Sequence, residues 1–511
     1  MPIALAHRAA WLRSAALGFL AWLIGLSALP LDWAPALLLL GALVVVPLGL
    51  ALLDDLDTVL RPLRLQSLLP WIQLLSGGTL LVSFPIYPGE RAGLLALPWL
   101  GFTAIAALLG FVRLVRDGYR SAAGIATSAG LIFLAIGGAW TLASRWGMEP
   151  MGFREPIVLL TGAHFHFAGF ALPVLTGLAA GSLRPLPARL AIAGVVLGVP
   201  FVAVGITAGG VLELSAAWFL AVTCLLVVWL QAELAVRAAF WPERGLFALS
   251  GLLLLAGMSL AAVYALSTFW KTDWLTIPQM IPWHGTLNAL GFALPGLLAW
   301  HLARLRGTEL QIVVPALGGQ PSLDQWEKRP LWPGVENGPA PGDGQDCYER
   351  EVGVEMPGAP EADGLHRRAA ESIMKYDIFP PRLVRPVLRR EPIQVGDTVG
   401  ICYHQAPGID VFFAARVVAC FDQEKDGVWR TGFTYRTLIG HPEYGEETFS
   451  FEKEMATGRV IVALRSWSRP GTVLALLCPP WVRRQQVRAS HAALAHLADL
   501  AKPQAATPAT P

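Results

Sequence analysis

Ten long, mostly apolar stretches follow one another through the first 306 residues, separated by short polar segments. Crossing about 30 Å of hydrocarbon takes roughly 20 residues of helix, so each stretch is long enough, or nearly so, to span a membrane. Interior prolines such as Pro173 and Pro295 are compatible with this, because packed neighbours satisfy the freed backbone groups. We predict a multi-pass α-helical membrane bundle, residues 1–306, of about ten transmembrane helices, with nine or eleven as alternatives. The stretches are 15–30, 35–53, 67–85, 93–112, 122–143, 157–180, 190–208, 212–236, 245–268 and 281–303.

The pattern changes after residue 306. Residues 307–366 are rich in Pro, Gly and acidic groups. Such a segment buries too little apolar surface to offset its ordering entropy, which predicts a flexible linker. A fragment that begins near Gly364 should therefore fold alone.

Beyond the linker, residues 367–511 show short runs in which apolar and polar residues alternate, as in a half-buried strand. A helical stretch follows Pro479 and reaches about Ala501. Strands followed by one long terminal helix predict a C-terminal α+β domain with an antiparallel, helix-grip-like sheet. The predicted strands are Val395–Tyr403, Asp410–Phe421, Val428–Tyr435, Glu446–Glu454 and Gly458–Ser468.

Charge follows the same division. Only 15% of the residues are charged and 54% are hydrophobic, whereas soluble domains carry about 25% charged residues. Residues 1–306 hold 17 Lys and Arg against 12 Asp and Glu, and residues 307–511 hold 22 against 25. The net charges, +5 and −3, and the lack of a basic, aromatic-interleaved patch exclude a nucleic-acid partner. The five cysteines form no CxxC pair, which favours free thiols.

The positive residues also predict the topology. With the N-terminus inside, thirteen Arg residues fall in cytoplasmic segments and four Arg or Lys residues fall in outside loops. Because cytoplasmic loops carry an excess of Lys and Arg, this asymmetry supports that orientation. An even number of spans then places both termini in the cytoplasm and leaves the first 306 residues in contact with membrane lipids.

Two groups of motifs resemble known families. Thr161-Gly-Ala-His-Phe-His-Phe-Ala-Gly-Phe170 and Trp283-His-Gly-Thr-Leu-Asn-Ala-Leu-Gly-Phe292 resemble the YndJ-like family of bacterial membrane proteins, which implies the inner membrane. The stretch from Gly432 to Phe449, with Ser466-Trp-Ser-Arg-Pro470 and Arg484-Gln-Gln486, looks like domain-of-unknown-function family 1990. Neither resemblance implies an activity.

Among the polar residues inside the predicted spans, the best functional candidates are His164, His166, His284 and Asn288. Ionisable groups within a membrane are rare and usually functional. Histidine binds haem iron, copper and zinc, so a haem or a transition metal is one interpretation. Hydrogen bonding between helices and a proton or substrate pathway are the others. At 100° per residue, His164 and His166 point about 200° apart, so they do not share one ion. We predict that His166 and His284 face one another in the outer half of the membrane.

The soluble part contributes a second candidate site, made of the polar residues of the long motif: Tyr435, Thr437, His441, Glu446, Glu447 and Arg469. One interpretation is structural, with a turn at Gly440–Gly445 and a cross-strand ion pair between Arg469 and Glu446 or Glu447. The other is ligand binding, because a sheet curved around a long helix can enclose an apolar pocket. No nucleophile elbow, phosphate loop or metal-spaced cluster points to an enzyme.

Two functions of different class follow from these sites. In the first, the protein is no enzyme, and its cytoplasmic domain binds a lipid or other small amphiphilic ligand as a sensor or carrier. In the second, it is a membrane haem or metal protein that uses His166 and His284.

Overall fold

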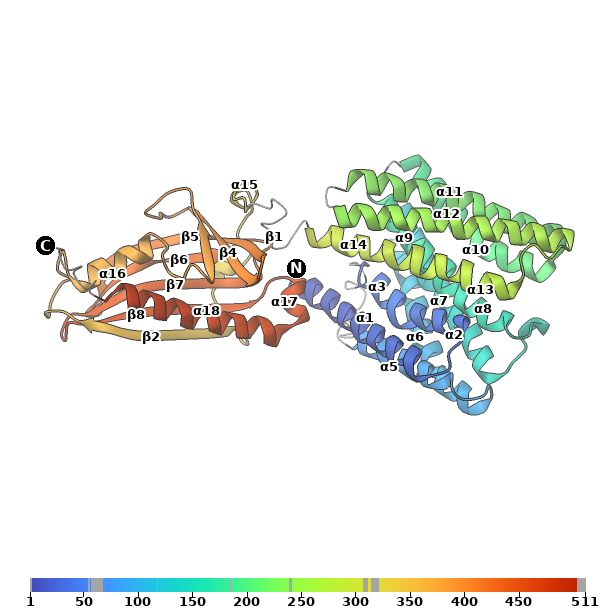
Figure 1. Cartoon of the computed structure of the whole chain (residues 1–511), viewed down its shortest axis with the longest axis horizontal. Helices are drawn as coiled ribbons and strands as arrows, with labels where there is room; N and C mark the ends of the chain where they lie inside the picture. The colour runs from blue at the N-terminus through green and yellow to red at the C-terminus, as the bar shows by residue number, and fades with distance from the viewer. Residues whose placement is uncertain are drawn as a thin grey trace, which may run out of the picture. The chain divides into compact units, whose positions relative to one another are not determined.

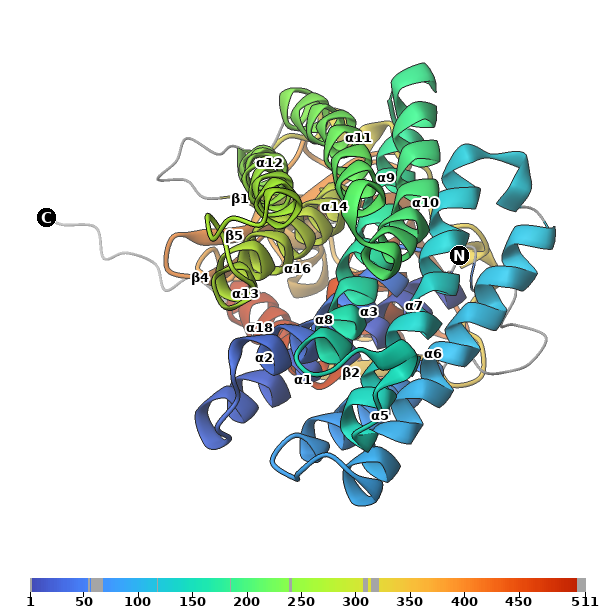
Figure 2. The same ribbon diagram turned by 90° about the vertical axis from the view of Figure 1, so that its right-hand side faces the viewer.

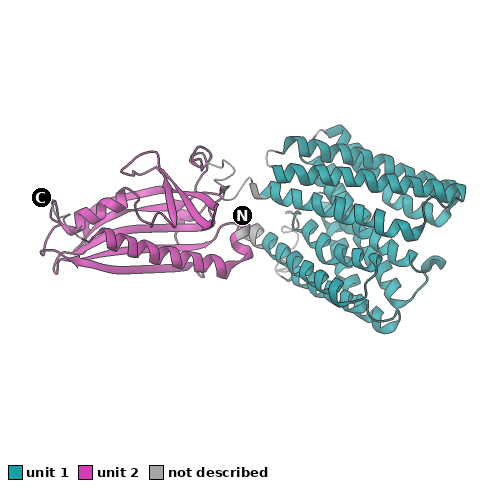
Figure 3. Cartoon of the chain, viewed as in Figure 1, with its two compact units in different colours: residues 1, 3–304 teal, residues 2, 305–511 magenta. Residues whose placement is uncertain are grey.

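The computed structural model describes residues 2–53, 56, 68–116, 118–183, 185–238, 241–306, 311–313 and 321–502. The chain divides into two compact units, one of residues 3–304 and the other of residues 305–511 (Figure 3). The division falls beside the predicted boundary at residue 306. Each unit has its own hydrophobic core.

The first unit is a bundle of long helices that run side by side (Figures 1 and 2). Nine described helices are long and apolar enough to cross a membrane, so the predicted multi-pass bundle is confirmed. The third predicted span corresponds to α5, a shorter apolar helix of 15 residues. The single helices are α1 (Pro2–Ala28), α5 (Leu69–Ser83), α6 (Glu90–Arg116), α7 (Ala122–Trp146), α10 (Pro185–Ala208), α11 (Gly210–Arg237) and α12 (Trp241–Trp270).

Three further spans contain a turn of π-helix in the middle. They are α2 (Trp33–Leu40), η1 (Gly41–Val45) and α3 (Val46–Leu50); α8 (Ile157–His164), η5 (Phe165–Ala171) and α9 (Leu172–Ala180); and α13 (Ile277–Thr286), η6 (Leu287–Ala293) and α14 (Leu294–Arg306).

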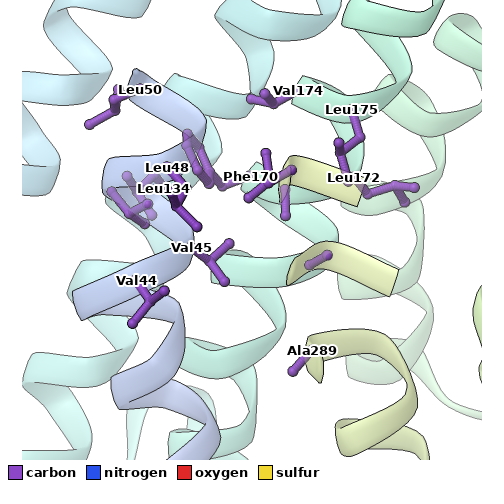
Figure 4. Packing of buried hydrophobic residues seen from close by; sticks show 14 of the residues in the cluster. Val44, Val45, Leu48, Leu50, Leu134, Phe170, Leu172, Val174, Leu175 and Ala289 are labelled. Carbon is purple, nitrogen blue, oxygen red and sulfur yellow. The ribbon is translucent and has the colours of Figure 1, made fainter. Parts of the chain in front are cut away.

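A proline follows each π-helical turn: Pro47, Pro173 and Pro295. Proline has no N–H to donate within the helix, so a wider turn precedes it. Side chains from other helices bond two of the carbonyl groups in these turns. Gln73 donates to the Ala42 oxygen at 2.8 Å, and Ser250 donates to the Phe292 oxygen at 3.0 Å. The turn η5 contacts both η1 and η6 in the core of the bundle (Figure 4).

The second unit is built on one antiparallel sheet with the strand order β2-β8-β7-β6-β5-β4-β3. The short strand β1 pairs with β5 outside this order. Along the chain, β2 and one helix directly precede six consecutive strands, β3 to β8, and a long helix ends the domain, which is the helix-grip-like arrangement predicted. The strands are β1 (Gln311–Val313), β2 (Gly344–Val354), β3 (Val384–Val387), β4 (Thr398–Ala406), β5 (Ile409–Lys425), β6 (Val428–Thr437), β7 (Glu443–Glu454) and β8 (Arg459–Pro470).

The predicted antiparallel sheet is confirmed. Strand β6 pairs antiparallel with β7, and β8 lies beside β7. The terminal helix α18 (Pro479–Leu500) packs on β2 and β8, and α16 (Leu365–Met374) packs on β6 and β7 (Figure 1). Phe449 and Phe451 alternate with polar neighbours and are fully buried beneath these helices, as their spacing predicts.

The predicted flexible linker is wrong for residues 321–366. Trp326, Trp332 and Val335 are buried, and β2 forms the edge strand of the sheet. Tertiary pairing provides the reason, since β2 forms a ladder with β8 from Gly344 to Val354. Residues 307–310 and 314–320 of the predicted linker lie outside the described residues.

This correction reverses the expectation for a fragment that begins at Gly364. Such a fragment lacks β2, which leaves β8 as an unpaired edge and exposes part of the surface under α18. Exposed edges of this kind promote aggregation. We expect residues 307–511 to give a monomer with a cooperative thermal transition and residues 364–511 to aggregate, as measured by gel filtration and circular dichroism. A monomeric, cooperatively folded shorter fragment would contradict the structural role of β2.

Candidate functional site

A cavity of about 670 Å³ lies in the second unit between the sheet and the helices that follow it. Strands β2 to β8 supply one wall, and α17 (Val473–Leu477) and α18 supply the other. Most of the lining is apolar, including Phe379, Ile401, Phe413, Trp467 and Val482. A cavity of this size, with mostly apolar walls and a few polar groups, is typical of a small-molecule site.

Five of the six predicted residues of the soluble site line this cavity: Tyr435, Thr437, His441, Glu446 and Glu447. Their strands explain the grouping. Tyr435 lies directly opposite Glu447 in the β6–β7 ladder, so both side chains project from the same face of the sheet. The phenol of Tyr435 donates a 2.5 Å hydrogen bond to the Glu447 carboxyl.

The sixth residue, Arg469, forms neither of the predicted ion pairs. Its guanidinium lies 3.6 Å from the Asp343 carboxyl and 4.1 Å from the centre of the Tyr444 ring. Glu446 instead pairs with Arg436, its cross-strand neighbour, at 2.7 Å. The prediction was wrong because it placed Arg469 opposite Glu446, whereas the ladder places it opposite Tyr444.

Sequence reasoning missed Glu443 and Asp346 as residues of the same cavity. Glu443 could have been found, because it lies four residues before Glu447 and strand residues at even spacing share a face. Asp346 lies on β2, inside the predicted linker, and forms an ion pair with Arg483 of α18 at 2.5 Å. This pair lowers the pKa of Asp346.

The two other carboxyls are held in a different electrostatic environment. Burial raises the pKa of Glu447 to about 8, against the opposing effect of the Tyr435 hydrogen bond. Burial also raises the pKa of Glu443 to about 7, with Gln486 and Arg483 acting in the opposite direction. Among the described residues, no Lys or Arg lies within ion-pair distance of either carboxyl. Both groups therefore exchange protons near neutral pH.

His441 completes the polar part of the wall and is 5% exposed. The N–H of Glu443 donates to His441 Nδ1 at 3.0 Å. The Glu443 carbonyl oxygen lies 3.1 Å from the same nitrogen, but a proton on Nδ1 would collide with the incoming N–H. The imidazole therefore carries its proton on Nε2, and no described group accepts a hydrogen bond from it. Burial lowers the pKa of His441 to about 3, so the ring is neutral.

In the membrane unit, the structure pairs His284 with His164 and not with His166. The rings of His164 and His284 stack with their centres 6.0 Å apart. His284 Nδ1 lies 2.9 Å from the Gly257 oxygen, and the Asn288 amide lies 3.3 Å from the same ring nitrogen. Asn288 therefore contacts His284 one turn away on the same helix.

His166 faces Trp99 of α6. The Trp99 indole donates to His166 Nε2 at 3.1 Å, and His166 Nδ1 lies 2.8 Å from the Gly162 oxygen. Both ring nitrogens are thus engaged, and the side chain is fully buried. The predicted pairing of His166 with His284 is wrong. The two histidines of span 157–180 point apart, as expected, but His164 is the one that meets the last span.

The pair His164–His284 offers two imidazole ligands. Each Nδ1 lies within hydrogen-bond distance of a backbone oxygen, and His284 Nε2 lies 3.5 Å from the Asn288 amide. A structural zinc site takes four protein ligands. No group of three or more His, Cys, Asp or Glu residues suited to a metal occurs in the described part of the chain. Haem or metal binding by these histidines stays a prediction.

Comparison with known proteins separates the same two parts. Residues 36–292, half of the chain, match the model of the YndJ-like protein family, and residues 334–496 match the domain of unknown function DUF1990. Fold and cavity define a multi-pass membrane protein with a helix-grip-like domain. The chain belongs to the YndJ-like protein family.

Two relatives resemble the two parts. The uncharacterized membrane protein YndJ of Bacillus subtilis is 32% identical over 216 residues, which is 42% of this chain and 39% of the relative. A UPF0548 protein of Dictyostelium discoideum is 31% identical over 124 residues, 23% of this chain and 57% of the relative. The chain thus spans well under two thirds of either relative. No solved structure matches it.

Proposed function

We propose that this membrane protein uses its C-terminal domain to bind a small amphiphile, as a sensor or carrier, on the cytoplasmic side of the inner membrane. The observation that carries the proposal is the cavity between the sheet and α18. Its apolar walls suit an alkyl chain, and several of its polar groups, among them Glu443, Glu447 and His441, lie on β7 and the turn before it. The membrane helices hold this domain beside a supply of lipids, and the Arg and Lys asymmetry supports the cytoplasmic side.

A thiol on the cavity wall provides the test. Cys478 is exposed and lines the cavity, whereas Cys347 is exposed on β2 and does not line it. We expect dodecanol to slow maleimide labelling of Cys478 and to leave Cys347 unchanged. The measurement is peptide mass spectrometry on the full-length protein in phosphatidylcholine nanodiscs.

A variant that fills the cavity checks the location. Ala489 of α18 lines the cavity, whereas Arg484 of α18 is exposed and does not line it. Ala489→Phe is expected to raise the dodecanol concentration needed for protection roughly tenfold, about 1.4 kcal/mol. Arg484→Phe, the matched control, should leave it unchanged. Equal labelling of Cys478 with and without dodecanol in the wild type would refute amphiphile binding in this cavity.

A further inference from the structure

The cavity wall has acidic side chains but no Lys or Arg among its described residues. The acidic ones are Asp346, Glu443, Glu446 and Glu447. Two of these carboxyls already have a cation, since Asp346 pairs with Arg483 and Glu446 pairs with Arg436. Glu443 and Glu447 have none within 4 Å among the described residues, although both are enclosed by the sheet and α18. A buried carboxylate without a cation is costly, so the wall is complementary to a positive charge.

His441 supplies a second and independent observation. Its Nε2–H is a buried donor on the cavity wall without an acceptor among the described groups. A buried polar group of this kind costs about 1–3 kcal/mol unless a ligand or water satisfies it. The adjacent ring of Phe413, 4.6 Å away at an angle of 81°, covers the imidazole and fixes its orientation. The ligand that fits must bring an oxygen acceptor to this nitrogen.

We propose that the cavity takes a long-chain amphiphile whose head group carries a protonated amine, seated against Glu443 and Glu447, with a neighbouring oxygen that accepts from His441. This inference rests on the proposed function and adds the chemical class of the ligand. An alkyl amine bearing a hydroxyl group has both features. A fatty acid would place its carboxylate against Glu443 and Glu447, which have no cation of their own among the described residues, and is rejected by the same wall.

The surrounding titratable groups do not supply the missing charge. From β6, Tyr435 donates its phenol to Glu447. From β4, Tyr403 hydrogen-bonds Gln485 of α18 at 3.1 Å, and from β2, Asp346 is held by Arg483. Burial raises the pKa values of both tyrosines, so neither carries charge near neutral pH. Amines have pKa values near 10.4, so an amine enters as a cation and displaces a proton from Glu443 or Glu447. Its affinity should therefore rise with pH through about 7 to 9.

The test compares three probes of equal chain length by protection of Cys478 in the full-length protein in phosphatidylcholine nanodiscs. We expect dodecylamine to protect at a concentration at least about tenfold lower than dodecanol, and dodecanoate to protect least. In Glu443→Gln/Glu447→Gln the advantage of the amine over dodecanol should disappear. Glu361→Gln, at an exposed glutamate outside the cavity, is the matched control and should keep it. Comparing each variant with the wild type cancels differences in partition into the nanodisc.

The outcomes separate the two proposals. If dodecanol still protects Cys478 in the double variant, the cavity of that variant is folded. Loss of the advantage of the amine in the same variant then supports the inference. A wild type that dodecanoate protects as well as dodecylamine, or an amine advantage that survives the double variant, overturns it and leaves amphiphile binding intact. Absence of protection by all three probes overturns both.

A fourth probe tests the oxygen. In the wild type, an amino alcohol of the same chain length should protect Cys478 at a lower concentration than dodecylamine does, and this difference should disappear in His441→Phe. A difference that is unchanged in His441→Phe removes His441 from the site.

Discussion

Replacing Lys453 with methionine is expected to lower the free energy of unfolding of the C-terminal domain by about 3–5 kcal/mol. The Lys453 side chain is completely buried in β7, and its ammonium lies 2.6 Å from the Glu355 carboxyl, which is 5% exposed. Methionine keeps the alkyl stem but leaves the Glu355 carboxylate buried without its cation. Thermal and urea unfolding of residues 307–511, followed by circular dichroism, would measure the loss.

An exposed ion pair of the same length provides the control. Lys375 and Glu371 also approach to 2.6 Å, but on the solvent side of α16, where both side chains are more than half exposed. Lys375→Met should cost less than about 1 kcal/mol, because exposed pairs contribute little. Glu355→Leu/Lys453→Met should regain part of the stability lost in the single variant, because no buried charge is then unpaired. A loss below 1 kcal/mol in Lys453→Met would show that Glu355 is not held against β7.

Glu355 also shows where sequence reasoning stopped. It lies in the segment that its Pro, Gly and acidic composition predicted to be a linker, yet its carboxyl accepts from the His366 N–H and pairs with Lys453. Composition measures what a segment can bury by itself, and β2 is stabilised by its ladder with β8. As an edge strand, β2 buries few of its own side chains, so its alternation of apolar and polar residues is weak.

The strands that could be predicted are those with strong alternation. In β7, Phe449 and Phe451 point into the core and the even spacing continues to Glu447, so the strand follows from the pattern. Glu443 has the same spacing but falls in the predicted turn, and it was therefore missed. Arg469 shows the limit, because its partner depends on the register of β7 against β8, which a motif does not give.

In the membrane unit, helical geometry predicted that His164 and His166 point apart, and they do. It could not predict which of them meets the last span, because the packing of α6, which brings Trp99 to His166, decides that. One signal was overlooked. Gly-Phe-Ala-Leu-Pro occurs at 169–173 and again at 291–295, and both copies overlap a π-helical turn and end at the proline after it.

Glu447→Gln is expected to make the ligand-free domain more stable at about pH 9 by up to about 5 kcal/mol, and to flatten the dependence of its stability on pH. Burial raises the pKa of Glu447 from 4.5 to about 8 in the folded domain. The folded state therefore binds a proton more tightly than the unfolded chain does. Its contribution to stability is fully present below the unfolded pKa and is lost as pH rises through about 8.

The interval from about pH 7 to about pH 9 isolates this effect. Below it, His441, whose pKa burial lowers to about 3, acts with the opposite sign, because the unfolded chain takes up a proton near its ordinary pKa of about 6.5. Within the interval the wild type should lose about 1 kcal/mol relative to Glu447→Gln, and Glu361→Gln should follow the wild type. Glutamine keeps an oxygen that can accept from Tyr435, so the difference reports the charge and not the hydrogen bond. Urea unfolding of residues 307–511 at several pH values measures it, and parallel curves for the wild type and Glu447→Gln would mean that the carboxyl already carries its charge beside a cation.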